Sequence, residues 1–176
     1  ESVPGLLAEL GARGCRAAVV ISAGFEGPSA AALRQAVLDA ARPHLLRVVG
    51  PNCLGVISPA LGVNASFAHV TPAAGGLALV SQSGAIAAAA LDWAHSRGLG
   101  FSQIVSLGDA IDVDVGDLLD WLAQDDATKA ILIYVESLSD ARKFMSAGRI
   151  AARAKPVVIM KAGRSAAGAK AAFSHT

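Results

Sequence analysis

Short apolar runs alternate with longer amphipathic stretches along most of this chain. Six of the apolar runs are five or six residues long and most are rich in valine and isoleucine, which is typical of parallel strands covered on both faces. These runs occupy residues 17–22, 45–50, 77–81, 101–106, 131–136 and 156–161. The stretches between them predict helices at residues 28–42, 84–97, 115–125 and 139–154. Such alternation predicts an α/β fold with doubly wound parallel sheets.

The alternation is interrupted between the second and third apolar runs. Residues 59–76 contain prolines and glycines without a sustained period, which predicts a linker. Residues 77–176 hold the later strands and helices, so we expect a flavodoxin-like domain there. Residues 1–58 predict only the back part of a Rossmann-like domain, because the glycine-rich first turn of such a domain is absent.

The composition narrows the possible function classes. A net charge of +1 gives no basic surface for nucleic acid, and no stretch predicts a membrane span or a signal peptide. Cys15 and Cys53 lie far apart without a zinc or disulfide pattern, which favours a reducing, cytoplasmic setting. The histidines lack the spacing of metal ligands, so no metal site is expected. The chain begins without methionine, from which we expect a piece excised from a longer protein.

Common nucleotide-binding and hydrolase motifs are absent. The stretch GRSAAGAK at residues 163–170 comes close to a P-loop, but an alanine stands where that motif requires lysine. Gly98 and Gly100 lack the third glycine of a dinucleotide fingerprint, and the serines of SQSG do not lie in a GxSxG motif. These observations exclude a P-loop enzyme, a dinucleotide-binding enzyme and a simple serine hydrolase.

The strongest candidate site lies where the apolar run at residues 77–81 gives way to the predicted helix at 84–97. The turn SQSG at residues 81–84 offers serines that can cap the helix, whose first turn has no carboxylate. Free N–H groups and the helix dipole at such a terminus attract anions, so the turn predicts a phosphate site. An ordinary serine-capped helix is the alternative.

Three further features lie at other strand ends or in the tail. Glu136 closes the run at 131–136, and a carboxylate there can face solvent, cap the next helix or orient a histidine by accepting a hydrogen bond. The turn GPNCLG at residues 50–55 is also typical of a tight turn with a buried cysteine. The tail, which carries Lys161 and His175, is also compatible with a flexible surface loop.

Taken together and in order, five segments of the chain resemble the NDP-forming acyl-CoA synthetases, which are relatives of succinyl-CoA synthetase. The segments are GPNCLGV, GGLALVSQSGAIAAAALDWA, SLGDAIDVDVGDLLDWL, TKAILIYVES and PVVIMKAGRSAAGAKAAFSHT. The resemblance covers essentially the whole chain, from late in the CoA-binding domain through the first succinyl-CoA-ligase domain. Asp109 departs from the family pattern, in which asparagine is common at this position.

The resemblance implies a three-step reaction. Phosphate attacks an acyl-CoA thioester to give an acyl phosphate, the phosphoryl group passes to a histidine, and the histidine passes it to ADP. In this chain, His175 matches the phosphohistidine and Glu136 matches the carboxylate that positions it. The implied phosphate-binding residues are Ser81, Gln82, Ser83, Gly84 and Ala85, and those lining the CoA and acyl site are Asn52 and Cys53.

The resemblance also implies ligands and partners. We expect this chain to bind coenzyme A, inorganic phosphate and a small carboxylic acid or its acyl-CoA. We expect ATP or ADP, with magnesium, to bind an ATP-grasp domain or subunit outside this chain. An oligomer is expected. Two alternatives stay open, namely an acyl-CoA-binding regulatory region of a protein lysine acetyltransferase fusion and a flavin-binding module. The acyl group and the choice between ADP and GDP are not readable from the sequence.

Overall fold

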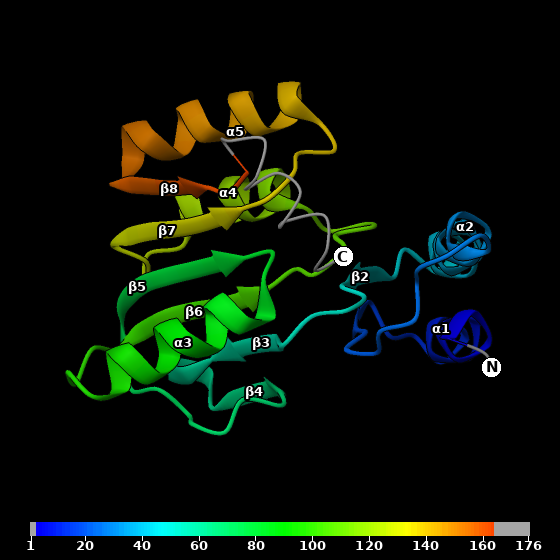
Figure 1. The fold of residues 1–176 in the computed structure, drawn as a ribbon, viewed down its shortest axis with the longest axis horizontal. Helices are drawn as coiled ribbons and strands as arrows, with labels where there is room; N and C mark the ends of the chain where they lie inside the picture. The colour runs from blue at the N-terminus through cyan, green and yellow to red at the C-terminus, as the bar shows by residue number, and fades with distance from the viewer. Residues whose placement is uncertain (1–2, 164–176) are drawn as a thin grey trace.

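The computed structural model describes residues 3–163, which form two α/β units (Figure 1). The N-terminal unit has a two-stranded parallel sheet and helices that pack on a small shared core. Its elements are α1 (Val3–Ala12), β1 (Ala17–Val19), α2 (Ala30–Ala41), the 3-10 helix η1 (Arg42–His44) and β2 (Arg47–Val49). Leu7, Val37 and Val48 are buried where the helices meet the sheet. The arrangement agrees with the expected partial Rossmann-like unit.

The C-terminal unit is built on a six-stranded sheet with the strand order β4-β3-β6-β5-β7-β8. Its strands are β3 (Gly55–Ser58), β4 (Val63–Ser66), β5 (Ala74–Ser81), β6 (Phe101–Ser106), β7 (Ala130–Val135) and β8 (Val157–Lys161). Its helices are η2 (Pro59–Leu61), α3 (Gly84–His95), α4 (Val115–Gln124) and α5 (Ala141–Ala154). The strands β6, β5, β7 and β8 are parallel and stand in flavodoxin-like order, which confirms the predicted doubly wound fold.

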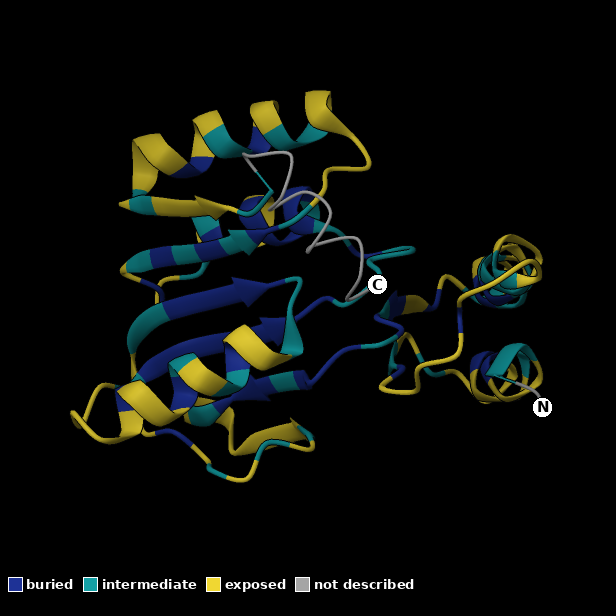
Figure 2. Ribbon diagram, viewed as in Figure 1, coloured by how far each residue is buried: buried dark blue, intermediate teal, exposed yellow. Residues whose placement is uncertain are grey.

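Helices cover both faces of the parallel strands, which explains why these strands read as continuous apolar runs. Helix α3 covers one face, where Leu79, Leu91 and Ile104 are buried together. Helices α4 and α5 pack side by side on the other face, over a core that includes Leu119 and Ile133. Figure 2 shows the central strands as the most buried part of the molecule, and every residue of β6 is buried.

Two strands at one edge of the sheet have no counterpart among the predicted elements. β3 pairs antiparallel with both β4 and β6, so the sheet is mixed. The linker predicted for residues 59–76 contains β4 and the first residues of β5, and so is not the irregular connection that the sequence suggests. β4 gives no apolar run because it is a four-residue edge strand with mostly exposed side chains. The domain boundaries stay a prediction.

The loop between β6 and α4 joins the two units. The N–H of Asp109 donates to the carbonyl of Pro51 at 3.0 Å, so the loop lies against the end of β2. Arg47 of β2 forms ion pairs with Asp112 at 3.0 Å and with Asp117 at 3.2 Å. Backbone pairing and charge pairing therefore both hold the N-terminal unit at the carboxyl end of the larger sheet.

Gly108 allows this loop to approach the N-terminal unit closely. Its φ is 55°, in the left-handed region that favours glycine. A Cβ atom at this position would lie 2.1 Å from the carbonyl oxygen of Pro51 and 2.3 Å from that of Asn52. A larger residue would therefore push the turn at residues 51–52 away from the end of the sheet.

Candidate functional site

The carboxyl ends of the parallel strands meet at one edge of the sheet. Ser81 lies opposite Ser106 on β6, and Val135, the residue before Glu136, lies opposite Lys161 on β8. The carboxyl ends of β5, β6, β7 and β8 therefore share one edge of the sheet. Open parallel sheets place their ligands at this edge, so the site is sought here.

A cleft of about 740 Å³ opens at this edge, between the two units. The turn at residues 52–54, the start of α3 and the ends of β7 and β8 contribute to its walls. The predicted site residues that line it are Asn52, Cys53, Gln82, Ser83, Gly84, Ala85 and Glu136. Ser81 is buried and does not line the cleft, and His175 lies outside the described residues. The fold thus brings the predicted phosphate-binding turn and the predicted CoA-binding turn to one space.

The turn between β5 and α3 is held by its two serines. The Ser81 hydroxyl donates to the carbonyl of Ser83 at 2.7 Å and accepts from the N–H of the same residue at 3.1 Å. The Ser83 hydroxyl caps α3 by accepting from the N–H of Ile86 at 3.3 Å. Among residues 3–163, the N–H groups of Gly84 and Ala85 find no hydrogen-bond partner. Two free N–H groups therefore point out of a helix end whose first turn has no acid, an arrangement that favours an anion.

Gln82 uses its side chain differently from the phosphate-binding role that the sequence suggests. Its Oε1 accepts from the N–H of Glu136 at 2.5 Å and from the N–H of Ser137 at 3.0 Å. Its Nε2 donates to the carbonyl of Ser137 at 3.0 Å. The amide of Gln82 is therefore engaged with the backbone that follows β7, and phosphate would compete with these bonds for it.

Glu136 is half-buried at the end of β7, where its carboxylate lines the cleft. Lys161 on the neighbouring strand donates from Nζ to the carbonyl of Glu136 at 2.8 Å. Tyr134 lies two residues earlier, on the same side of the strand. Burial raises the pKa of Tyr134, and the charge and hydrogen bond of Glu136 raise it further. The carboxylate thus sits beside a neutral phenol and remains open to the cleft as a hydrogen-bond acceptor.

Asn52 and Asp109 form part of the opposite wall. Asn52 has a φ of 56°, which asparagine tolerates better than most residues, and its side-chain nitrogen lies 3.4 Å from Oδ1 of Asp109. The other oxygen of Asp109 accepts from Nη2 of Arg34 at 2.8 Å. The Asp109 side chain is only 6% exposed. The wall of the cleft thus contains a carboxylate, which Arg34 of α2 neutralises.

Cys53 is buried beneath the same wall. Its thiol donates to the carbonyl of Val20 at 3.4 Å. Burial raises the pKa of the Cys53 thiol to about 11. The thiol is therefore neutral near pH 7, and Cys53 contributes packing instead of a nucleophile.

Alkylation of Cys53 by iodoacetamide is expected to speed up about tenfold per pH unit between roughly pH 8 and 10, because only the thiolate reacts. The thiolate fraction keeps rising throughout this range, because it reaches one half only at the pKa of about 11. Residue-resolved mass spectrometry separates this reaction from that of Cys15. A rate that is half-maximal near pH 9.0, the ordinary pKa of a cysteine thiol, would show that Cys53 reacts only after local opening.

Tyr134, which lines the cleft, and Arg34, which pairs with Asp109 of its wall, were not singled out from the sequence. Tyr134 could have been found, because the period of two along a strand places it on the same side as Glu136. Arg34 carries no such signal, since it reaches Asp109 from 75 positions away. Its place depends on how the two units pack.

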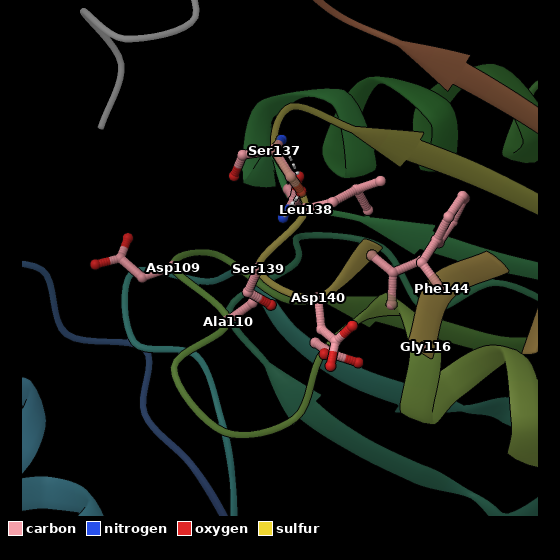
Figure 3. Close-up of a pocket in the computed structure, with 11 residues that line it drawn as sticks. Asp109, Ala110, Gly116, Ser137, Leu138, Ser139, Asp140 and Phe144 are labelled. Atoms are coloured by element: carbon pink, nitrogen blue, oxygen red, sulfur yellow. Dashed lines mark hydrogen bonds between the residues drawn. The ribbon is translucent and has the colours of Figure 1, made fainter. Parts of the chain in front are cut away.

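A smaller cavity of about 40 Å³ lies beside the cleft, between the loops that lead into α4 and α5 (Figure 3). Asp140 caps α5 by accepting from the N–H of Lys143 at 2.9 Å. Figure 3 shows the Asp109 carboxylate lying apart from the other side chains, on the side of the N-terminal unit. The space suits about one or two water molecules, so we treat it as a gap between capped helix ends.

Comparison with known families identifies the larger unit. The family profile of the succinyl-CoA ligase-like flavodoxin domain matches residues 74–176, more than half of the chain. The chain belongs to this family. A CoA-binding domain profile matches residues 1–59. The resemblance to NDP-forming acyl-CoA synthetases is thereby confirmed.

Two relatives of the chain are ADP-forming acetate–CoA ligases. The ADP-forming acetate–CoA ligase I of Archaeoglobus fulgidus is 48% identical over 99% of this chain and 26% of its own length. The alpha subunit of the ADP-forming acetate–CoA ligase I of Pyrococcus furiosus is 40% identical over 99% of this chain and 38% of its own length. The chain therefore spans about a quarter to two fifths of these relatives.

A solved structure agrees with the fold. The dinucleotide-forming acetyl-coenzyme A synthetase 1 of Ca. Korarchaeum cryptofilum, in complex with phosphate and ADP, superposes with a TM-score of 0.91 at 35% identity. The match covers 98% of this chain and 38% of that one. Both units are thus shared with this family member.

Membrane-spanning helices and clusters of metal-binding side chains are both missing from residues 3–163. Within residues 3–163, no helix combines the length and the apolar character needed to cross a bilayer. Over the same range, no group of three or more histidine, cysteine, aspartate or glutamate side chains is placed to hold a metal ion.

Proposed function

We propose that this chain is the CoA-ligase part of an NDP-forming acyl-CoA synthetase, which interconverts an acid, CoA and ATP with acyl-CoA, ADP and phosphate. The observation that carries the proposal is the cleft. In it, a helix N-terminus with two free N–H groups, the carboxylate of Glu136 and the turn at residues 52–54 face one space. Family membership and the relatives, which are ADP-forming acetate–CoA ligases, support the same activity.

The geometry suggests a role for each part. In the direction of ATP formation, a phosphate oxygen attacks the thioester carbonyl, CoA leaves as the thiolate, and an acyl phosphate forms. The N–H groups of Gly84 and Ala85 hold the phosphate. His175 then takes the phosphoryl group, releasing the carboxylate, and passes it to ADP. Glu136 accepts a hydrogen bond from one ring nitrogen of His175, which leaves the other nitrogen free as nucleophile.

The second half of the reaction requires a partner. The chain has no P-loop pattern, so we assign ATP or ADP with magnesium to an ATP-grasp domain or subunit. CoA is assigned to the turn at residues 52–54, on the wall contributed by the CoA-binding unit. A small carboxylic acid, a cytoplasmic location and an oligomeric protein belong to the same proposal.

The regulatory alternative has less support. The relatives reported above are ligases, and a region that only bound acyl-CoA would have no use for a phosphorylatable histidine. A flavin-binding module is not favoured either, because the matching profiles are those of CoA enzymes.

Gly84→Asp tests the proposed phosphate site. The carboxylate would occupy the field of the helix N-terminus, so we expect the apparent affinity for phosphate to fall by about a hundredfold. The fold should persist, because a Cβ at Gly84 meets nothing closer than the backbone nitrogen of Leu54 at 3.6 Å and acids are favourable in a first helical turn. The measurement is ATP formation from acetyl-CoA, ADP and phosphate by the protein that carries this chain, with its ATP-grasp partner.

Gly84→Asn is the matched control, because it has the same size without the charge. We expect the apparent affinity of this variant for phosphate to be about tenfold higher than that of Gly84→Asp. Equal phosphate affinities in the wild type and the aspartate variant would contradict a phosphate site at this helix end. Absence of any ATP formation by the wild type with all carboxylic acyl-CoA substrates would contradict the proposed activity itself.

A further inference from the structure

Gln82 bridges two loops that carry separate parts of the proposed site. Its backbone belongs to the turn that leads into α3, directly before the N-cap residue Ser83. Its side chain reaches across the edge of the sheet to the backbone of Glu136 and Ser137, which are 54 and 55 positions away. The backbone N–H of Gln82 also donates to the carbonyl of Tyr134 at 3.1 Å. Four hydrogen bonds thus connect one residue of the phosphate turn to the end of β7.

Within residues 3–163, the side-chain amide of Gln82 makes all of its hydrogen bonds to one short backbone segment. Oε1 takes both N–H groups that follow β7, and Nε2 takes the carbonyl of Ser137, so both polar atoms of the amide act together on one short segment. A side-chain amide that bonds two consecutive residues fixes their peptide plane as well as their position. The fixed segment begins at Glu136, so the origin of its side chain is fixed as well.

We propose that Gln82 is a positioning residue that couples the phosphate turn to Glu136, instead of a ligand for phosphate. Through this bridge, the carboxylate that orients His175 is held at a set distance from the helix N-terminus that holds phosphate. The inference rests on the proposed function and extends it. It assigns Gln82 an effect on phosphoryl transfer to His175 and little effect on phosphate affinity.

The need for such a bridge follows from the topology. β5 and β7 are neighbours in the sheet, but their loops leave it in different directions, toward α3 on one face and toward α5 on the other. Regular strand pairing ends with Ser81 opposite Tyr134. Beyond that point, the backbone N–H and the side-chain amide of Gln82 tie the two loops together, and the side chain does so at Glu136 and Ser137.

The test compares Gln82→Met, Glu136→Gln and the double variant in the protein that carries this chain, with its ATP-grasp partner. Methionine keeps the length of the side chain and removes the amide. We expect Gln82→Met to slow the transfer of phosphate from labelled ATP to His175 by roughly 10- to 100-fold, because small misplacement of a reacting group has effects of this size. The KM for phosphate should change by less than about twofold. Gln124→Met is the control, since Gln124 also donates to a backbone carbonyl, that of Asp120 at 3.1 Å, but on the exposed side of α4.

The double variant separates a positioning role from a structural one. If Gln82 acts through Glu136, the double variant should be no more than about twofold slower than Glu136→Gln alone. Multiplied effects of the two substitutions, or a large rise in the KM for phosphate in Gln82→Met, would overturn the proposal and make Gln82 an independent contact to phosphate.

Hydrogen–deuterium exchange of the segment 131–140, measured by mass spectrometry, tests the bridge without any activity. Gln82→Met should speed the exchange of the amides of Glu136 and Ser137, whereas Gln124→Met should leave them unchanged. Unchanged exchange in Gln82→Met would overturn the bridge. If exchange is faster in Gln82→Met but the wild-type protein is never phosphorylated on His175, the bridge stands and the proposed function is overturned.

Discussion

Replacement of His175 by asparagine is expected to abolish the phosphorylated form of the protein. Without the imidazole, no group in the proposed mechanism can carry the phosphoryl group between the acyl phosphate and ADP, so the two half-reactions become separate. Loss of the nucleophile that carries a covalent intermediate lowers turnover by roughly 10⁴-fold or more. Labelled ATP and magnesium, added to the complete protein, should leave an acid-labile phosphate on the wild type and none on His175→Asn.

His69→Asn is the matched control for this experiment. His69 is an exposed histidine whose Nε2 lies 2.7 Å from Oδ1 of Asp92, and it is not among the residues that line the cleft. We expect it to be labelled like the wild type. Equal labelling of His175→Asn and the wild type would contradict the phosphohistidine and would place the phosphate on another residue.

Replacement of Glu136 by glutamine should lower the rate of His175 phosphorylation by roughly 10³-fold, because the orienting carboxylate also stabilises positive charge on the ring. Glutamine fills the same space but brings an N–H₂ group that can favour the wrong tautomer. A stopped-time measurement of label on His175 gives the rate. Glu26→Gln, at an exposed loop position, is the control that should leave it unchanged.

The same variant has a spectroscopic consequence. The negative charge and hydrogen bond of Glu136 raise the pKa of Tyr134, so their removal should lower that pKa. The difference between the ultraviolet titrations of Glu136→Gln and the wild type should then show one tyrosinate forming at lower pH in the variant. An unchanged titration would show that the carboxylate does not face Tyr134 in solution.

The sequence predicts the parallel strands well because the strands are covered on both faces and so appear as continuous apolar runs. β5, β6, β7 and β8 all fall within or overlap the predicted ranges. β3 and β4 are missed because they are four-residue strands whose pairing is set by contacts with β6 and with each other. A short edge strand with polar side chains carries little local signal, and its existence follows only from the rest of the fold.

The candidate site shows the same limit at the level of single residues. Residue type and strand-end position are local, and they suffice to find Glu136 and the turn that begins at Ser81. The use that each side chain makes of its polar atoms is not local. The sequence assigns Gln82 to phosphate, but its partners lie after another strand, and the sequence holds no sign that the two loops meet there.

The pairing of Arg34 with Asp109 has a consequence for how this protein can change over time. Asparagine at position 109 would leave the guanidinium of Arg34 without its charged 2.8 Å partner. Loss of the arginine alone would leave a nearly buried carboxylate without a counter-ion, which is strongly unfavourable. The arginine should therefore be required for as long as position 109 holds a carboxylate, although 75 positions separate the two residues.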